Sequence, residues 1–274
     1  MGVTSRLLGV ILMGCSFLQL FAANDSNTKY LNGPNLHLDE EVVVNNRLRD
    51  SLALVDFHTR AGGDDWFLKW DLTAPMWQWA GVTLDASGCV ICLDLDGQGG
   101  CTSAGSGNGL IGNISPRLGE LANLEHLYLG NNNMTGPLPI GIFNLPNLKE
   151  VDIFGNQLIG PLPANIGNAT NITDLMLSGN NMTGPLPASL GDLKNLENLF
   201  LDNNKFTGPL PATIGSATNL INIKLNNNEI ASEIYIGSTL LSVALFISGY
   251  KGPRPIRYLG PLISIGDTCT NIII

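Results

Sequence analysis

Charged side chains are scarce in this chain of 274 residues. Asp, Glu, Lys and Arg together make up 14% of it, and the 23 acidic residues outnumber the 14 basic ones, so the formal net charge is −9. Binding to nucleic acid depends on clustered basic side chains that neutralise phosphates. The composition therefore excludes a nucleic-acid partner.

Groups that carry catalysis are also few. The three histidines, His37, His58 and His126, lie in unrelated segments, and no serine or cysteine nucleophile motif accompanies them. The glycines at 107, 109 and 112 satisfy G-x-G-x-x-G but open no dinucleotide-binding βαβ unit. The segment 94–97, Asp-Leu-Asp-Gly, lacks the remaining oxygen ligands of a calcium loop. We therefore predict that the protein is not an enzyme and expect neither a cofactor nor a metal.

Repetition is what the sequence has in abundance. An asparagine recurs every 24 residues, and each of the last five follows two apolar residues at L-x-L spacing, such as Leu127 and Leu129. The six repeated asparagines are Asn108, Asn132, Asn156, Asn180, Asn204 and Asn228. This period predicts a solenoid of stacked coils, in which the leucines of each short strand point inward.

The rest of each repeat also has a predictable conformation. The repeated asparagine follows the strand where the chain turns, and its amide can satisfy backbone groups of neighbouring coils, which predicts an asparagine ladder. Segments such as 184–191, with Gly-Pro-Leu-Pro and then apolar residues, cannot form a long helix because of their prolines. We expect each of them to return as extended chain followed by a short 3₁₀-like turn.

The tandem pattern N-x-[LM]-x-G-P-L-P-x-x-[IL]-G, from about residue 90 to 234, resembles the plant-type class of leucine-rich repeats. That class occurs in ectodomains of receptor-like kinases, in receptor-like proteins and in polygalacturonase-inhibiting proteins. The resemblance implies an α/β fold: a curved solenoid with a parallel β-sheet on its concave face, 3₁₀ and extended turns on its convex face, and a helical N-terminal cap. It also implies ligand binding by the inner face and its flanks.

The chain divides into five segments. Residues 1–22 read as a signal peptide, with Arg6 before an apolar run at 7–21 and small residues at 22 and 23. The others are a variable segment at 23–45, a cap at 46–88, a solenoid at 89–235 with an insertion at 97–107, and an atypical tail at 236–274. Two alternatives for the N-terminus are an uncleaved membrane anchor and a bacterial lipoprotein, because residues 12–15 approximate a lipobox ending at Cys15.

The expected cap contains a helix and four tryptophans. Residues 47–60 carry Leu48, Leu52 and Val55 on one stripe and end before two glycines, which predicts an amphipathic helix. The segments 62–66 and 77–82 resemble the elements that precede the first strand in this repeat class. The cysteines that commonly flank W-x-G-V in plant caps are replaced by Trp77 and Leu84, which argues against the usual cap disulfide. We expect the tryptophans to lie in the core.

Removal of the signal leaves Cys89, Cys92, Cys101 and Cys269. Four cysteines in an oxidising compartment permit two disulfides in three pairings. Cys101 lies in the insertion, which separates Leu95 from its repeated asparagine by 13 residues instead of 3. We expect Cys101 to pair with Cys89 or Cys92, and we reject a zinc site because no second nearby cysteine pair exists.

Six N-x-S/T sequons suggest glycosylation, although an Asn- and Thr-rich repeat also produces such triplets by accident. One of them, at Asn113, is impaired by Pro116 directly after it. The candidates for glycosylation are Asn24, Asn133, Asn168, Asn171 and Asn181. Together with the leader, they favour a secreted or cell-surface protein. Asn133 and Asn181 are equivalent in the repeat, so their sugars would coat one flank.

The strand positions that point away from the leucines should line the concave surface. The position before the first leucine gives one column: Cys92, His126, Glu150, Asp174, Asn198 and Asn222. The position between the two leucines gives a second column: Asp94, Tyr128, Asp152, Met176, Phe200 and Lys224. The position after the second leucine gives a third column: Asp96, Gly130, Phe154, Ser178, Asp202 and Asn226. Apolar side chains beside carboxylates suit a basic or mixed peptide, or a protein loop. The ten residues that we predict to bind such a ligand are His126, Tyr128, Glu150, Asp152, Phe154, Asp174, Met176, Asn198, Phe200 and Asp202. The alternative is a solvated sheet face.

The C-terminal tail admits three interpretations. Alignment of Leu240, Val243 and Leu245 with residues 220, 223 and 225 gives a shortened last coil, which we favour. The second interpretation is a transmembrane helix at 234–250, which would attach the chain to a membrane. The third is an aberrant or truncated gene end, which would explain why the tail has no repeat character.

We thus predict a non-catalytic extracellular recognition protein that binds a protein or peptide through its concave face. The alternatives are a secreted inhibitor of a hydrolase, a membrane-anchored receptor-like protein without a kinase, and a structural matrix component. Because no kinase signature follows the repeats, signalling would need a partner chain such as a co-receptor.

Overall fold

The computed structural model describes residues 36–98, 100–101, 107–230 and 244–246. The expected signal peptide, Cys15, Asn24, Cys269 and most of the segment 234–250 lie outside the described residues. Side chains are described from residue 45 onward, but not for residues 244–246.

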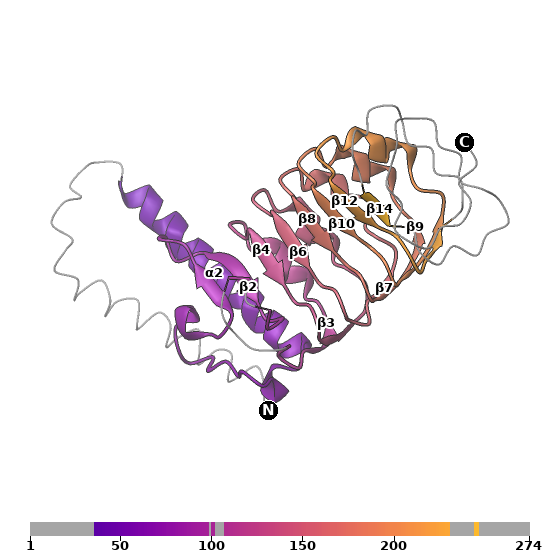
Figure 1. Ribbon diagram of the computed structural model, residues 1–274. Helices are drawn as coiled ribbons and strands as arrows, with labels where there is room; N and C mark the ends of the chain where they lie inside the picture. Colours follow the sequence, from indigo (N-terminus) through magenta and orange to yellow (C-terminus); the bar gives the residue numbers. More distant parts are fainter. Residues whose placement is uncertain (1–35, 99, 102–106, 231–243, 247–274) are drawn as a thin grey trace, which may run out of the picture.

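The described chain forms a solenoid with one main sheet (Figure 1). Its strands, in spatial order, are β1 (Val82–Leu84), β2 (Val90–Asp94), β4 (His126–Tyr128), β6 (Glu150–Asp152), β8 (Asp174–Met176), β10 (Asn198–Phe200), β12 (Asn222–Lys224) and β14 (Ala244–Phe246). From β2 onward the strands are parallel, whereas β1 is antiparallel to β2. The predicted fold class, a leucine-rich-repeat solenoid with a parallel sheet and an N-terminal helix, is confirmed.

The return path of each coil contains short flank strands and 3₁₀ turns. The flank strands are β3 (Ile111–Asn113), β5 (Asn133–Thr135), β7 (Ile159–Gly160), β9 (Asn181–Pro185), β11 (Lys205–Gly208) and β13 (Glu229–Ile230). The 3₁₀ turns are η4 (Pro116–Glu120), η5 (Ile140–Asn144), η6 (Ile166–Asn168), η7 (Ala188–Asp192) and η8 (Ala212–Ser216). Proline is the N-cap of η5, η7 and η8 and the first residue of η4, because its fixed φ suits entry into a turn.

The repeated asparagines form a buried ladder between the coils. Asn156 shows the pattern: its Nδ2 donates to the carbonyls of Leu129, Ile153 and Phe154 at 3.0–3.3 Å, and its Oδ1 accepts the Met134 N–H at 2.9 Å. The same contacts recur at Asn132, Asn180, Asn204 and Asn228. Asn108 differs, because its amide bonds both the N–H and the carbonyl of Leu68 in the cap. The first rung of the ladder therefore ties the cap to the solenoid.

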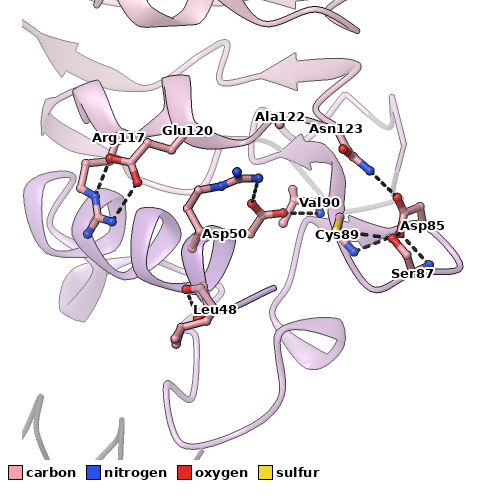
Figure 2. A network of polar contacts seen from close by, with 12 residues as sticks. Leu48, Asp50, Asp85, Ser87, Cys89, Val90, Arg117, Glu120, Ala122 and Asn123 are labelled. Carbon is pink, nitrogen blue, oxygen red and sulfur yellow. Dashed lines mark hydrogen bonds and ion pairs between the residues drawn. The ribbon is translucent and has the colours of Figure 1, made fainter. Parts of the chain in front are cut away.

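The cap helix α2 (Leu36–Arg60) covers the N-terminal end of the solenoid and begins earlier than the expected residue 47 (Figure 1). Its buried face contains Asp50, Ala53, Leu54 and Phe57, all without exposed surface, whereas Leu48 is 43% exposed. The predicted stripe is therefore correct only in part: Val55 packs against the core and Leu52 is half-buried, but Leu48 is exposed. A charged residue occupies the buried face because the Asp50 carboxylate accepts the Val90 N–H at 3.0 Å, at the start of β2 (Figure 2).

Three of the four tryptophans lie in the core of the cap, as expected. Trp66, Trp70 and Trp79 are at most 6% exposed, and their indole N–H groups donate to backbone carbonyls at 2.7–2.9 Å. The expectation was wrong for Trp77, which is 64% exposed. His58 is buried beside Trp66 and Trp70, and burial lowers the pKa of its imidazole.

The tail contributes the strand β14, which pairs with β12. Leu245 is the register partner of Ile223, so the coil that we favoured forms a strand there, but two residues away from our alignment. Residues 244–246 are thus not helical. No helix in the described part of the chain is both long and apolar enough to cross a membrane.

Candidate ligand-binding face

The predicted concave columns are aligned by the parallel register. His126, Glu150, Asp174 and Asn198 are successive partners, as are Tyr128, Asp152, Met176 and Phe200. All ten residues proposed for ligand binding are partly exposed, including Phe154 and Asp202 just after their strands. The fold therefore brings these side chains onto one surface, because every coil repeats the same strand position.

The first coil departs from this pattern. Cys92, Asp94 and Asp96 are at most 2% exposed, so the expectation that they line the open surface was wrong. The insertion covers them: a disulfide joins Cys92 to Cys101, and the Cys101 N–H donates to Asp94 Oδ2 at 3.0 Å. This pairing is one of the two that we expected. Cys89 is buried and forms no disulfide with another described cysteine.

The pinned insertion makes one wall of a cavity. Gly100 packs so closely against the ring of Tyr128 that an added Cβ would lie 2.3 Å from the ring. The cavity has a volume of about 220 Å³ and is lined by Asp96, Gln98, Gly100, Tyr128, Glu150, Val151, Asp152, Asp174 and Met176. Four of these nine residues are acidic and none is basic. We call this cavity the acidic pocket.

Burial and mutual repulsion shift the ionisation of the acidic pocket. Burial raises the pKa of Asp152 to about 6, the charges of Asp96 and Glu150 add to the rise, and the Phe154 N–H opposes it. Burial also raises the pKa of Asp96, as does the neighbouring Asp94. Near neutral pH the pocket therefore holds unfavourable negative charge that a cation would neutralise.

Tyr128 sits at the edge of the pocket and is held by an acid. Its hydroxyl donates to Glu150, and burial together with that carboxylate raises the pKa of the phenol far above its usual range. His126 stacks on Tyr128 with ring centroids 5.9 Å apart and lies 3.5 Å from Glu150 and 3.8 Å from Glu125. Tyr128 therefore remains a neutral hydroxyl that orients the carboxylate beside it.

The other end of the face has a different character. Asn222 Nδ2 donates to Asn198 Oδ1 at 2.7 Å, and Asn198 Nδ2 donates to Asp174 Oδ1 at 2.6 Å. The ammonium of Lys224 lies 4.1 Å from the centre of the Phe200 ring. The apolar stripe expected from the sequence is therefore partly covered at Phe200 by a cation–π contact.

Sequence reasoning missed two residues of this face, Gln98 and Gly100, which line the pocket. The length of the insertion was the available signal for them. Asn222 and Lys224 stood in the predicted columns but not among the ten selected residues, although they contact Asn198 and Phe200. The face offers carboxylates suited to charge-assisted hydrogen bonds with a cationic group. Within the described residues, no three His, Cys, Asp or Glu side chains are arranged to hold a metal ion.

Comparison with known proteins places this architecture in a class. Residues 122–167 match the family model for two copies of leucine-rich repeats, and residues 171–193 and 195–217 match the model for single leucine-rich repeats. No curated protein matches the chain.

Solved plant structures share the solenoid. The Arabidopsis receptor kinase HAESA, in complex with the peptide hormone IDA and the co-receptor SERK1, has 26% identity over 72% of this chain, with a TM-score of 0.61. The ectodomain of the receptor kinase SOBIR1 from Arabidopsis thaliana has 28% identity over 67% of this chain and 96% of its own length, with a TM-score of 0.53. A plant ice-binding protein has 26% identity over 68% of this chain and 58% of its own, with a TM-score of 0.59.

The chain contains leucine-rich repeats, and its structure is similar to those of plant receptor-kinase ectodomains, which supports the plant-type repeat class expected from the sequence. It spans 33% of the HAESA structure and 28% of the receptor PEPR1 in its complex with AtPEP1.

Proposed function

We propose that the protein is a non-catalytic extracellular recognition protein whose concave face binds a protein or peptide, with one basic side chain of the ligand in the acidic pocket. The observation that carries this proposal is the pocket itself. It places four carboxylates around about 220 Å³ without a basic residue in its lining. HAESA, whose structure contains a peptide hormone, supports a ligand of this kind.

The lining of the pocket suits a lysine or arginine side chain. Val151 and Met176 offer apolar contact to the methylene stem, while the carboxylates accept hydrogen bonds from the charged end. Asp152 and Glu150 come from one strand, β6, and Asp174 from the next strand, β8. A basic group would therefore be held across two coils whose relative position is fixed by the parallel register.

A library of random peptides displayed on phage tests this proposal. We expect the full-length chain to capture peptides enriched in arginine or lysine. Asp152→Asn and Glu150→Gln should each weaken binding of a selected peptide about 10- to 100-fold, because a charge-assisted hydrogen bond contributes about 1.5–3 kcal/mol. Binding would be measured by calorimetry against the unaltered protein.

The matched control is Asp192→Asn. Asp192 is an exposed carboxylate in η7, on the return side of a coil. The substitution removes one negative charge, as the two pocket variants do, and should leave binding unchanged. Selected peptides without basic residues, or equal losses in all three variants, would contradict a basic side chain in the pocket.

We also propose that the protein is secreted and acts with a membrane-bound co-receptor. The structural neighbours are ectodomains of plant receptors, and HAESA is seen with its co-receptor SERK1. Expression of the full chain in eukaryotic secretory cells, followed by an alkaline carbonate wash, tests the location. Recovery in the medium supports secretion, and retention in the washed membrane supports attachment of the chain to the membrane.

A further inference from the structure

Two isoleucines on the flank of the solenoid are unusually exposed. Ile111 in β3 is 46% exposed, and Ile159 in β7 is 52% exposed. Neither belongs to the ligand-binding face. Large apolar side chains on the outer surface of a sheet favour association between molecules unless something covers them.

Each of these isoleucines has a sequon asparagine as its partner on the next strand. Ile111 pairs with Asn133, and Ile159 pairs with Asn181, in the parallel registers β3–β5 and β7–β9. Neighbouring strands lie about 5 Å apart, so a sugar attached to either asparagine would begin beside the isoleucine. The flank strands β11 and β13, which carry no strongly exposed apolar side chain, begin instead with the exposed charged residues Lys205 and Glu229.

The amide nitrogens of the two asparagines are not used by the fold. No hydrogen bond from Nδ2 of Asn133 or of Asn181 exists within the described residues, and Oδ1 of Asn133 accepts from Gln157 at 3.4 Å. The amide nitrogens therefore point to no protein acceptor that would explain why asparagine stands at these positions.

The sequons on the convex side are different. Asn168 Nδ2 donates to Asn144 Oδ1 at 3.0 Å, and Asn171 Nδ2 donates to the Pro146 carbonyl at 2.7 Å. The contact of Asn171 recurs at Asn147 and Asn195, which are not in sequons. Asparagine at these positions is therefore explained by packing between coils.

We infer that Asn133 and Asn181 carry N-linked glycans whose first sugars cover Ile111 and Ile159. In the attachment, Nδ2 of each asparagine forms a bond to the anomeric carbon of an oligosaccharide. The bond from that carbon to the diphosphate of a lipid-linked donor breaks, and one Nδ2 proton is lost as the lipid diphosphate leaves. The glycans lie on the flank and leave the concave face open.

Glycopeptide mass spectrometry of the full chain, expressed in eukaryotic cells behind an added cleavable leader, tests the sites. We expect glycans on Asn133 and Asn181 in most molecules and lower occupancy at Asn168 and Asn171. Because the leader is supplied, the result does not depend on the native N-terminus or on the ligand of the concave face. A secreted chain without sugar at Asn133 and Asn181, or with higher occupancy at the convex sequons, would overturn the assignment.

Light scattering tests the covering role. The double variant Asn133→Gln/Asn181→Gln should scatter several-fold more light than the unaltered protein at equal concentration, and the added changes Ile111→Thr and Ile159→Thr should restore the original signal. Asn45→Gln, a change of an exposed asparagine outside any sequon, is the control and should alter neither the glycans nor the scattering. Equal scattering by the glycan-free double variant, or no recovery with threonine, would show that the glycans do not cover these side chains.

Discussion

At the scale of single residues, Asp152 shows how a repeated position acquires a distinct property. The same column holds Tyr128, Met176 and Phe200 in neighbouring coils. Asp152 differs from these three because it is an acid that lies near two other acids, Asp96 and Glu150, and its pKa is raised to about 6 mainly because it is buried. The raised pKa means that ionised Asp152 opposes folding, so its contribution to stability is present at low pH and is lost as pH rises through about 6.

Binding of a basic peptide should have the opposite dependence on pH. We expect the affinity to fall about 10-fold from about pH 7 to about pH 5, because Asp152 becomes protonated and no longer attracts the cation. Calorimetry at several pH values, with a peptide selected from the library, would measure this change in affinity. Asp96, Glu150, Asp174 and His126 also face this region, so Asp152→Asn should flatten the profile near pH 6 without abolishing it. An identical profile in the variant would show that another group controls binding.

At the scale of elements, the insertion in the first coil adds a wall to the face of the sheet and so forms a pocket there, with Gln98 and Gly100 in its lining. Without it, Asp94 and Asp96 would lie on an accessible surface like their equivalents in later coils. The disulfide between Cys92 and Cys101 closes a short loop, and the backbone N–H groups of Gln98 and Cys101 donate to Asp96 and Asp94. The wall of the pocket therefore depends on a covalent bond and on two buried carboxylates.

Removal of this disulfide should affect binding more than folding. We expect Cys101→Ser to weaken capture of the selected basic peptide at least about 10-fold. The free energy of unfolding should fall by no more than about 3 kcal/mol, because a disulfide that closes a short loop removes only that much conformational entropy from the unfolded chain. Capture and urea denaturation measure the two effects. Cys89→Ser is the control, since Cys89 lies outside the disulfide. Unchanged capture by the Cys101 variant would mean that the insertion plays no part in the ligand site.

At the scale of the whole molecule, stability depends on contacts between neighbouring coils and on a covered end. Each coil adds its leucines to one continuous core, and each ladder asparagine from Asn132 onward bonds its own coil and the preceding one. The N-terminal end of this core is closed by α2 (Figure 1). Trp66, Trp70 and Trp79 are buried in the cap. In such an array the effect of a local change is greatest in the adjacent coils.

A core residue of the cap helix tests this locality. Phe57 is fully buried, and Phe57→Ala should destabilise the chain by about 3–5 kcal/mol. Hydrogen exchange should accelerate in β2 and β4 well before it does in β10 and β12. Leu48→Ala, on the same helix but at a position 43% exposed, should change stability by less than about 0.5 kcal/mol. Uniform acceleration in all strands would show that the solenoid unfolds as a single unit.

Particular elements show how much of the fold could be predicted from the sequence. The 24-residue period predicted the parallel strands, the 3₁₀ turns and the asparagine positions, because every coil repeats the same local pattern. The cap was less predictable. The apolar spacing selected Leu48, Leu52 and Val55, but the helix buries Asp50 completely and leaves Leu48 exposed. The Asp50 carboxylate accepts the Val90 N–H, a contact between segments that the apolar spacing does not predict.

The sequence by itself determined the solenoid, the inward leucines and the residues that share the concave face, since a strand repeats its side-chain direction every two residues and the coils repeat every 24. Only the tertiary structure decided that Cys92 pairs with Cys101, that the insertion encloses an acidic pocket, and that Asn133 and Asn181 lie beside exposed isoleucines. These features join residues from different coils or from a nonrepeating loop. Their contacts depend on how the coils stack and on where the insertion folds, which no local periodicity specifies.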